Sequence, residues 1–234
     1  MIRMRSGKVL KLARQRAGLE ETLVEVEGKI EKALNYPLMT GFVKEGDIVI
    51  LNTTALFLGL GTGGYHFIMF NYSNVSLDSS TPGHIMKLRY TPLQIKCLCA
   101  EESASPISEC IRDVKDLDNM PVVAGSLHSM VAPACAAIKA KSFDIKVAYI
   151  MTDGGALPIY FSDLVAKLKD ERLIDVTITT GHAFGGDLEA VNLYSGLICA
   201  KAWGADVAIV AMGPGITGTG TRFGHTGLEQ GEII

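Results

Sequence analysis

Short runs of apolar residues alternate with segments of helical periodicity in the second half of the chain. Four of these runs have the length of buried strands, and each passes into a loop that contains glycine: residues 121–124, 145–150, 176–179 and 206–211. Helices are predicted at residues 107–116, 129–141, 158–170 and 187–203, and a further strand at residues 93–98. Strands that alternate with helices pair in parallel. We therefore predict an α/β fold with a Rossmann-like parallel sheet.

The first part of the chain has a different pattern, in which short strand-like runs are separated by turn residues. The predicted strands are residues 9–13, 23–27, 48–51 and 65–70. Several short strands in one small region suit a β-barrel of the OB or SH3-like kind. The turn-rich stretch at residues 73–92 marks a junction. We predict a small β-barrel domain at residues 1–75 and the Rossmann-like domain at residues 76–234.

Capping residues place two helix starts. Asp187 is a good N-cap for the helix predicted from that position. The run Thr226-Gly227-Leu228-Glu229 has the pattern of a capping box and predicts another helix. The chain stops at Ile234, within the first turns of that helix. We expect from this that the α/β domain is truncated at its C-terminus.

The composition is that of a globular protein with a sizeable core, with 48% apolar and 20% charged residues among 234. No run reaches the roughly 18 apolar residues that a membrane span needs, and no apolar signal-peptide core follows the N-terminus. We expect a cytoplasmic protein without a membrane partner. The five cysteines form no C-x-x-C pair, which argues against a zinc knuckle. Homo-oligomer formation is left open.

The charge is uneven along the chain, although the net charge is only -3. Residues 1–16 contain no acid and six basic groups: Arg3, Arg5, Lys8, Lys11, Arg14 and Arg16. The favoured interpretation is a solvated face of the first strand. The alternative is contact with a polyanion, so nucleic acid is a candidate partner through this strand alone.

Polar residues of a catalytic type follow three of the four predicted strands. His128 lies in a serine-flanked loop, Asp153 directly follows a buried strand, and His182 follows a glycine. Because the carboxyl ends of parallel strands meet at one edge, we expect these residues near a common crevice. His182 and His128 are the predicted acid–base groups, and Asp153 orients one of them or holds a metal. The alternatives are a helix cap or loop contact for each histidine and an Asx-turn for Asp153.

The loop after the fourth strand contains a G-x-G-x-x-G match at residues 213–218. A dinucleotide site also needs a helix at the third glycine and an acid about 20 residues later, and both are missing. Residues 59–64 match the same pattern between strands, where it has no such meaning. We therefore regard dinucleotide binding as unlikely. Backbone N–H groups and threonine hydroxyls of residues 213–221 could instead hold phosphate or carboxylate.

The predicted ligand-binding residues lie on the four loops or just beyond them: Gly213, Gly215, Thr217, Gly218, Thr219, Ser126, Ser129, Asp187 and His225. A divalent metal held by His128, Asp153, His182 and Asp187 is an alternative that no local spacing supports. Lys87 and Arg89 could anchor an anion near the junction, but a solvated strand face is favoured.

Seven longer runs of sequence stand out together: Asn52-Thr53-Thr54-Ala55, Gly59-Leu60-Gly61-Thr62-Gly63-Gly64-Tyr65-His66-Phe67, residues 83–94, Gly125-Ser126-Leu127-His128-Ser129, residues 152–158, residues 181–192 and Met212-Gly213-Pro214-Gly215. Over essentially the whole chain these runs resemble a bacterial family named domain of unknown function 3866. The resemblance implies a bacterial, cytoplasmic protein that continues past Ile234. It carries over no activity, cofactor or catalytic residue.

The sequence favours an enzyme, a hydrolase or group transferase, that acts on an anionic small molecule at the carboxyl edge of the sheet, with a phosphorylated metabolite or nucleotide as one candidate. A typical NAD-dependent dehydrogenase is not expected, because the dinucleotide pattern fails. The alternative is a non-catalytic module that senses a ligand and whose barrel contacts nucleic acid or a protein. Substrate, reaction and metal dependence do not follow from the sequence.

Overall fold

The computed structural model describes residues 1–79 and 81–234. They form two compact units, Met1–Ser79 and Ser80–Ile234. The predicted division after residue 75 lies close to this boundary. Each unit is described by itself.

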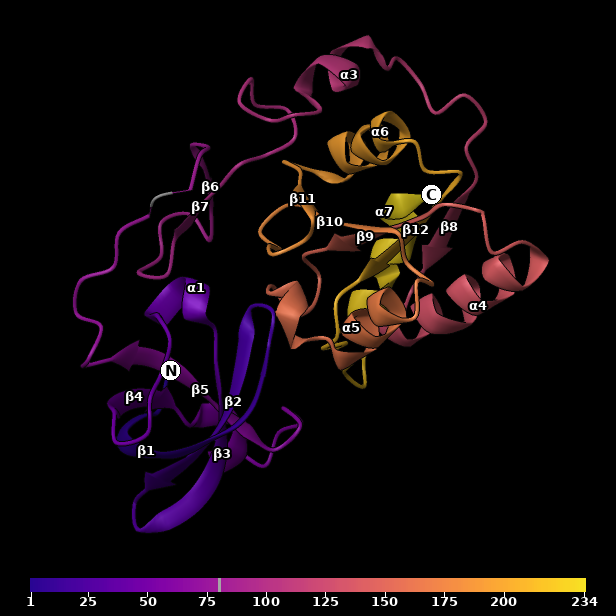
Figure 1. Cartoon of the computed structure of the whole chain (residues 1–234). Helices are drawn as coiled ribbons and strands as arrows, with labels where there is room; N and C mark the ends of the chain where they lie inside the picture. Colours follow the sequence, from indigo (N-terminus) through magenta and orange to yellow (C-terminus); the bar gives the residue numbers. More distant parts are fainter. Residues whose placement is uncertain (80) are drawn as a thin grey trace. The chain divides into compact units, whose positions relative to one another are not determined.

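The first unit is a closed five-stranded barrel with the strand order β1-β2-β3-β5-β4 (Figure 1). Its elements are β1 (Met4–Arg16), β2 (Leu19–Val26), β3 (Lys29–Asn35), α1 (Pro37–Thr40), β4 (Ile48–Asn52), α2 (Thr54–Phe57) and β5 (Tyr65–Asn71). Alternate residues along the strands point inward, and Val9, Val24 and Leu51 are fully buried in the core. The predicted small β-barrel is confirmed at this level.

Strand β3 was not predicted from the sequence, because its seven residues are mostly helix formers such as Lys, Glu, Ala and Leu. It forms because a two-residue turn folds the chain back onto β2. Glu27 and Gly28 have φ values of 50° and 74°, as both central residues of a type I′ hairpin turn require. The barrel register then pairs β3 antiparallel with β2 and parallel with β5.

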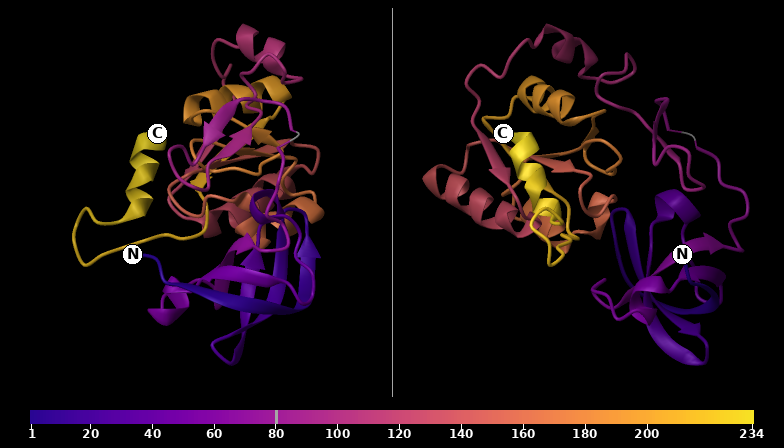
Figure 2. Two further views of the ribbon diagram at one scale, coloured as in Figure 1. Left: turned by 90° about the vertical axis from the view of Figure 1, so that its left-hand side faces the viewer. Right: turned by 180° about the vertical axis from the view of Figure 1, so that it is seen from behind.

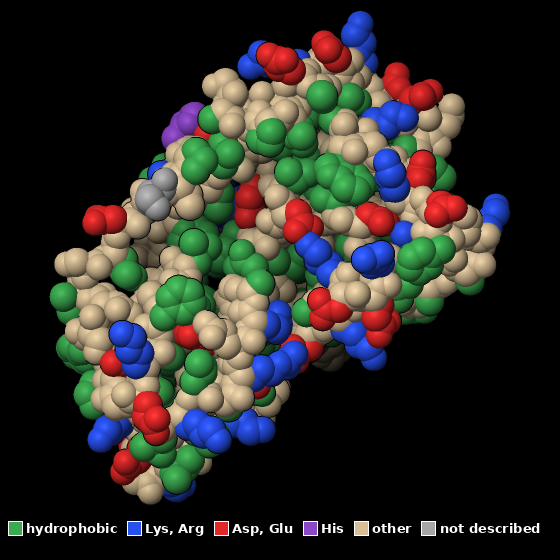
Figure 3. Space-filling view, viewed as in Figure 1, with side chains coloured by type: hydrophobic (Ala, Val, Ile, Leu, Met, Phe, Trp, Pro, Cys, Tyr) green, Lys and Arg blue, Asp and Glu red, His purple; other side chains and the backbone are tan. Residues whose placement is uncertain are grey.

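The basic first strand carries much of its charge in ion pairs. Arg3 and Arg5 bind the carboxylate of Glu27 at 2.7 and 2.5 Å, and Arg14 binds Glu21 at 3.1 Å. The hydrogen bonds from Arg5 and Arg3 lower the pKa of Glu27 to about 2. Figure 3 shows acidic and basic side chains lying among one another on the face of the barrel in view. This arrangement suits the solvated strand face better than a polyanion site.

The second unit contains an all-parallel sheet with the strand order β11-β10-β9-β12-β8. Its strands are β8 (Val122–Gly125), β9 (Val147–Thr152), β10 (Val176–Thr179), β11 (Leu188–Glu189) and β12 (Val207–Met212). Every residue of β9, β10 and β12 is buried, as expected for strands covered on both faces. An antiparallel pair, β6 (Ile85–Lys87) with β7 (Ile95–Cys97), precedes the sheet. The predicted α/β architecture is confirmed.

Helices form a layer on each face of the sheet (Figures 1 and 2). The helical elements are α3 (Ser108–Asp113), η1 (His128–Met130), α4 (Val131–Lys141), η2 (Ile159–Phe161), α5 (Asp163–Asp170), α6 (Leu193–Trp203), η3 (Thr226–Glu229) and α7 (Gln230–Ile233). Helices α4 and α5 pack with Tyr149 and Met151 on one face. Helices α3 and α6 pack with Ala148 and Ile150 on the other. The alternation of residues along β9 thus builds both cores.

The strand order creates a crevice at the carboxyl edge. The chain passes from β9 through α5 to its neighbour β10, and then returns through α6 on the opposite face to β12, on the other side of β9. The connections that leave β9 and β10 therefore run over opposite faces of the sheet. In open α/β sheets, ligands bind where connections diverge in this way.

The start of α6 differs from the prediction. The helix begins at Leu193 and not at Asp187, and its N-cap is Asn192, whose side chain accepts the N–H of Ser195 at 3.0 Å. Residues 188 and 189 form β11 instead, because their backbone pairs with the end of β10. None of the helices in the described part of the chain is long and apolar enough to cross a membrane.

Candidate functional site

A cleft of about 300 Å³ opens beyond the ends of β9 and β10 in the α/β unit. Four parts of the chain line it: Thr152 and Asp153 after β9, Thr180 and Gly181 after β10, residues 191–194 at the start of α6, and Glu229, Glu232 and Ile233 of η3 and α7. Its volume is at the lower end of the range for small-molecule sites. The cleft lies at the sheet edge where the sequence predicted a site.

Asp153 and His182 are brought together, but through the backbone of the histidine. The His182 N–H donates to Asp153 Oδ2 at 2.8 Å. Gly181 has a φ of 62°, and a Cβ at this position would clash with the same carboxylate. Glycine therefore allows the β10 loop to approach the acid that ends β9. Asp153 itself remains exposed and lines the cleft.

The imidazole of His182 is held by another segment. Its Nδ1 accepts the backbone N–H of Leu88 at 3.0 Å, and Arg89 Nη2 lies 3.4 Å from its Nε2. A ring nitrogen that accepts an N–H carries no proton, so His182 Nδ1 is unprotonated in this arrangement. Leu88 adopts a φ of 51°, which is unusual for a residue other than glycine. The ring thus fixes a turn of the chain, and it is not among the side chains that line the cleft.

Glu229 is a functional candidate that the sequence analysis did not single out as a site residue. Burial raises the pKa of its carboxyl, the nearby Thr152 hydroxyl lowers it, and the charges of Asp153 and Glu232 raise it again, so that the net direction is upward. Gly154 lies directly against the Glu229 carboxylate, which leaves no room for a side chain there. Three carboxylates therefore share one cleft. Only the capping-box position of Glu229 marked it in the sequence.

Thr152 places a hydroxyl group at the base of this acidic cluster. The residue is 4% exposed and lines the cleft. Its Oγ1 is buried and has no hydrogen-bond partner of good geometry among the described residues, although it lies near enough to Glu229 to affect that group's pKa. Leaving a buried hydroxyl unpaired costs about 1–3 kcal/mol. A bound ligand atom would satisfy it.

His128 belongs to a different network, beneath α5. Its Nδ1 lies 3.1 Å from Tyr149 Oη and its Nε2 lies 2.7 Å from Ser162 Oγ. The Tyr149 hydroxyl donates to carbonyls at the end of β12, so its oxygen accepts from His128 Nδ1–H, and Nε2 accepts from Ser162. Burial lowers the pKa of His128, in agreement with a neutral ring. Within the described residues, His128 makes no hydrogen bond with Asp153 or His182.

Asp187 is neither a helix cap nor a cleft residue. Its carboxylate accepts from the N–H and hydroxyl of Thr177, both at 2.8 Å, and pairs with Lys169. Burial opposes ionisation of Asp187, but the bonds from Lys169 and Thr177 outweigh it and hold its pKa below the ordinary value. Asp187 therefore joins β10 to α5. The alternative of a metal held by these residues finds no support, because the described residues contain no group of three or more His, Cys, Asp or Glu arranged to hold a metal.

The loop at residues 213–221 forms an exposed excursion. Thr217 and Thr226 exchange backbone and hydroxyl hydrogen bonds, Thr219 N–H donates to Gly224, and Gly218 bridges to His225. Predicted ligand residues Gly213 and Gly215 lie at its base, where Gly213 packs closely against Ala156. Because these loop groups are paired with one another, an anion cradle is not evident. Of the remaining predicted residues, Ser126 contacts Met130 and Ser129 is exposed after β8.

Lys87 corrects a second expectation, since it is buried and not on a solvated face. It is 1% exposed, and its three donors reach Thr179 O, Ala183 O and Glu189 Oε2 at 3.0, 2.6 and 2.7 Å. Glu189 also accepts from Thr179 Oγ1 and from Gly185 N–H, both at 2.6 Å. This satisfied network ties β6 to the β10 loop. It supports the cleft wall without lining it.

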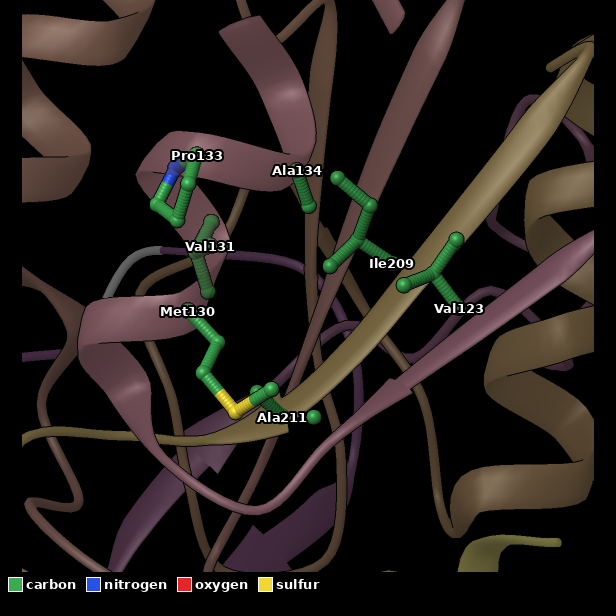
Figure 4. Close-up of a pocket in the computed structure, with 8 residues that line it drawn as sticks. Val123, Met130, Val131, Pro133, Ala134, Ile209 and Ala211 are labelled. Atoms are coloured by element: carbon green, nitrogen blue, oxygen red, sulfur yellow. The ribbon is translucent and has the colours of Figure 1, made fainter. Parts of the chain in front are cut away.

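A second pocket of about 210 Å³ lies between α4 and the strands β8 and β12 (Figure 4). Its lining is apolar, and the side chain of Met130 extends toward Ala211. No ionisable group lines it. This pocket provides no group that could take part in a reaction, so the acidic cleft remains the candidate site.

Comparison with other proteins identifies the family of this chain. No curated protein and no solved structure matched the chain. A family described as "Protein of unknown function (DUF3866)" matches residues 32–234, which include the first unit from within β3 onward and the whole α/β unit. This match confirms the resemblance seen in the sequence, and the chain belongs to the DUF3866 family.

Proposed function

We propose that the α/β unit is an enzyme of the hydrolase or group-transferase class, in which Asp153 and Glu229 handle protons at a small polar ligand. The proposed site is the cleft beyond β9 and β10. The connections from β9 and β10 over opposite faces of the parallel sheet support a site at this edge, and they are consistent with the Rossmann-like fold that we propose for the unit.

One observation carries the proposal, namely that two neighbouring carboxylates have unlike surroundings. Glu229 is half-buried and its pKa is raised, whereas Asp153 is exposed and accepts a backbone N–H. A carboxyl group with a raised pKa can give and take protons nearer to neutral pH. A second, exposed carboxylate such as Asp153 can orient or stabilise a positive charge. Such divergent pairs are typical of acid–base sites.

The two histidines have supporting roles in this proposal. His182 positions Asp153 with its backbone N–H and holds Leu88 with Nδ1 of its ring. His128 links Tyr149 of β9 to Ser162 at the start of α5. Neither imidazole reaches the cleft, so proton transfer falls to the carboxylates.

Turnover of an unknown substrate can be tested with a mixture of small metabolites. The purified protein is incubated with a metabolite extract, and every component is followed by liquid chromatography and mass spectrometry. The wild-type protein should deplete a component and form a product. Glu229→Gln and Asp153→Asn should each slow this by about 10²-fold or more, as is typical for loss of an acid–base group.

The matched control is Glu171→Gln. Glu171 carries a carboxylate on the surface after α5, and its ion pair with Lys167 spans 3.8 Å. This substitution should leave depletion unchanged. Depletion that survives both cleft substitutions would contradict the proposed roles. Binding without any turnover would favour the alternative, a non-catalytic ligand sensor.

A further inference from the structure

The lining of the cleft combines two kinds of group. It contains the carboxylates of Asp153, Glu229 and Glu232 and the first residues of α6. Acids attract a cationic group, whereas the N-terminus of a helix attracts an anionic one. A ligand that fits this cleft must satisfy both kinds of group.

The helix side is open to a ligand because its cap covers only part of it. Asn192 accepts the N–H of Ser195, and its carbonyl accepts the N–H of Gly196. The N–H groups of Leu193 and Tyr194 have no acceptor among the described residues, as the first helical positions have none within a helix. Helix α6 has 11 residues, so its dipole is developed. Both residues line the cleft.

The unpaired hydroxyl of Thr152 is an independent sign of a missing ligand. The residue is buried and lines the cleft, and its hydroxyl acts on the nearby Glu229 carboxylate, but no donor among the described residues reaches its oxygen. A hydroxyl oxygen can accept from an ammonium group while the carboxylates balance its charge. Thr152 thus distinguishes this cluster from a merely solvated group of acids.

We propose that the cleft binds a zwitterion, whose ammonium group lies among Thr152, Asp153 and Glu229 and whose carboxylate meets the free N–H groups at the start of α6. The ligand class is that of amino acids and related amino carboxylates. This inference rests on the cleft assigned under the proposed function.

Neither a simple anion nor a simple cation fits as well. An anion alone would approach three carboxylates, which repel it across a partly desolvated space. A cation alone would leave the N–H groups of Leu193 and Tyr194 without an acceptor. The anionic ligand predicted from the sequence corresponds to one end of the zwitterion, held by a helix N-terminus in place of the loop at residues 213–221.

Titration calorimetry with defined probes tests the proposal. The zwitterionic probes are glycine, β-alanine, γ-aminobutyrate, 5-aminovalerate and the common L-amino acids. Butyrate and butylamine serve as singly charged matches for γ-aminobutyrate. The best zwitterion should bind at least about tenfold more tightly than its matched anion or cation, since one charge-assisted hydrogen bond is worth that much.

Substitutions assign the two ends. Leu193→Pro removes one N–H at a position where proline suits a helix, because Asn192 has the extended backbone (φ -151°, ψ 177°) that precedes proline. Leu193→Ala keeps the N–H and controls for the lost side chain. Binding should weaken about tenfold in Leu193→Pro relative to Leu193→Ala. Thr152→Val should weaken it relative to Thr152→Ser, which keeps the hydroxyl.

The affinity should also fall in acid. An ammonium group among the acids favours ionised Glu229, so protonation of Glu229 must oppose binding. Asp153, Glu229 and Glu232 are the titratable groups that line this cleft.

The outcomes separate this inference from the proposed function. No preference for a zwitterion over its matched ions, or equal affinities of Leu193→Pro and Leu193→Ala, would overturn it. If metabolite depletion still depended on Glu229 in that case, the enzymatic proposal would stand with another ligand class. Zwitterion binding without depletion would support the ligand class and count against catalysis.

Discussion

Glu229 carries an energetic cost that its surroundings impose. Burial and the charges of Asp153 and Glu232 raise the pKa of this carboxyl, so the folded protein holds the proton more tightly than the unfolded chain does. By linkage, the resulting stability is fully present below the unfolded pKa and is lost as the pH rises through the folded pKa. At neutral pH the ionised group therefore destabilises the fold.

Glu229→Gln should for this reason raise the melting temperature at pH 7. The gain should shrink on acidification and vanish below about pH 4, where the unfolded carboxyl is protonated as well. Thermal unfolding of wild type and variant across pH 3.5–8 measures it, with Glu171→Gln as the control. A variant that is less stable at pH 7 would show that Glu229 makes stabilising contacts that outweigh the repulsion.

Lys87 is the residue whose loss should destabilise the α/β unit most clearly. Lys87→Ala leaves the Glu189 carboxylate, which is 13% exposed, without its cation. Removal of one partner of such a pair costs about 3–5 kcal/mol. Urea unfolding measures this, and Lys167→Ala at an exposed pair should cost less than about 1 kcal/mol.

The double substitution Lys87→Met with Glu189→Gln separates charge from packing. It should cost less than the sum of the two single substitutions, because neither charge is then buried alone. Additive losses would contradict the coupling between Lys87 and Glu189.

At the level of single residues, the role of some side chains could be predicted from the sequence and that of others could not. Asp153 could be predicted because it directly follows a buried strand at the edge where ligands bind. Glu229 could not, since it comes from a segment far along the chain that only the fold returns to β9. Lys87 looked like a surface residue, because nothing local shows that three acceptors surround it.

Among the elements, α6 shapes the cleft most directly, and its start depends on Asn192. Asn192 and Ser195 form a reciprocal capping box. Asn192→Ala should therefore cost about 1 kcal/mol in urea unfolding, whereas Asn192→Asp, which keeps an acceptor, should cost little. Equal losses for both variants would show that the cap contributes nothing.

The elements that the sequence predicted correctly are those with strong local patterns. Strands β9 and β12 are continuous apolar runs, and α4 lies within the helix predicted at residues 129–141. Helix α5 forms the second part of the helix predicted at residues 158–170, because Ser162 caps it and it begins at Asp163. Strand β11 and the late start of α6 were missed because backbone pairing with β10 overrides the helix signal at Asp187. Strand β3 was missed because its hairpin partner, not its composition, determines it.

At the scale of the whole molecule, limited proteolysis can test the division of the chain into two compact units. Tyr72 and Leu77 are 56% and 53% exposed in the segment that follows the barrel, whereas Tyr149 and Phe184 are buried in the α/β unit. Limited chymotrypsin digestion should cut in the exposed segments, after Tyr72, Leu77 or Tyr90 and in the loop at Phe223, and should leave the barrel and the parallel sheet resistant. Early cuts inside the parallel sheet would contradict two separately compact units.

Native mass spectrometry of the whole chain tests the central claim, that the acidic cleft beyond β9 and β10 is the ligand site. The protein is mixed with a metabolite extract, desalted gently, and its native mass is compared with its denatured mass. We expect an excess mass of a small ligand on wild type and on Glu171→Gln, and its loss from the double variant Asp153→Asn with Glu229→Gln. An excess mass that persists in the double variant would place the ligand elsewhere and contradict the assignment of the acidic cleft.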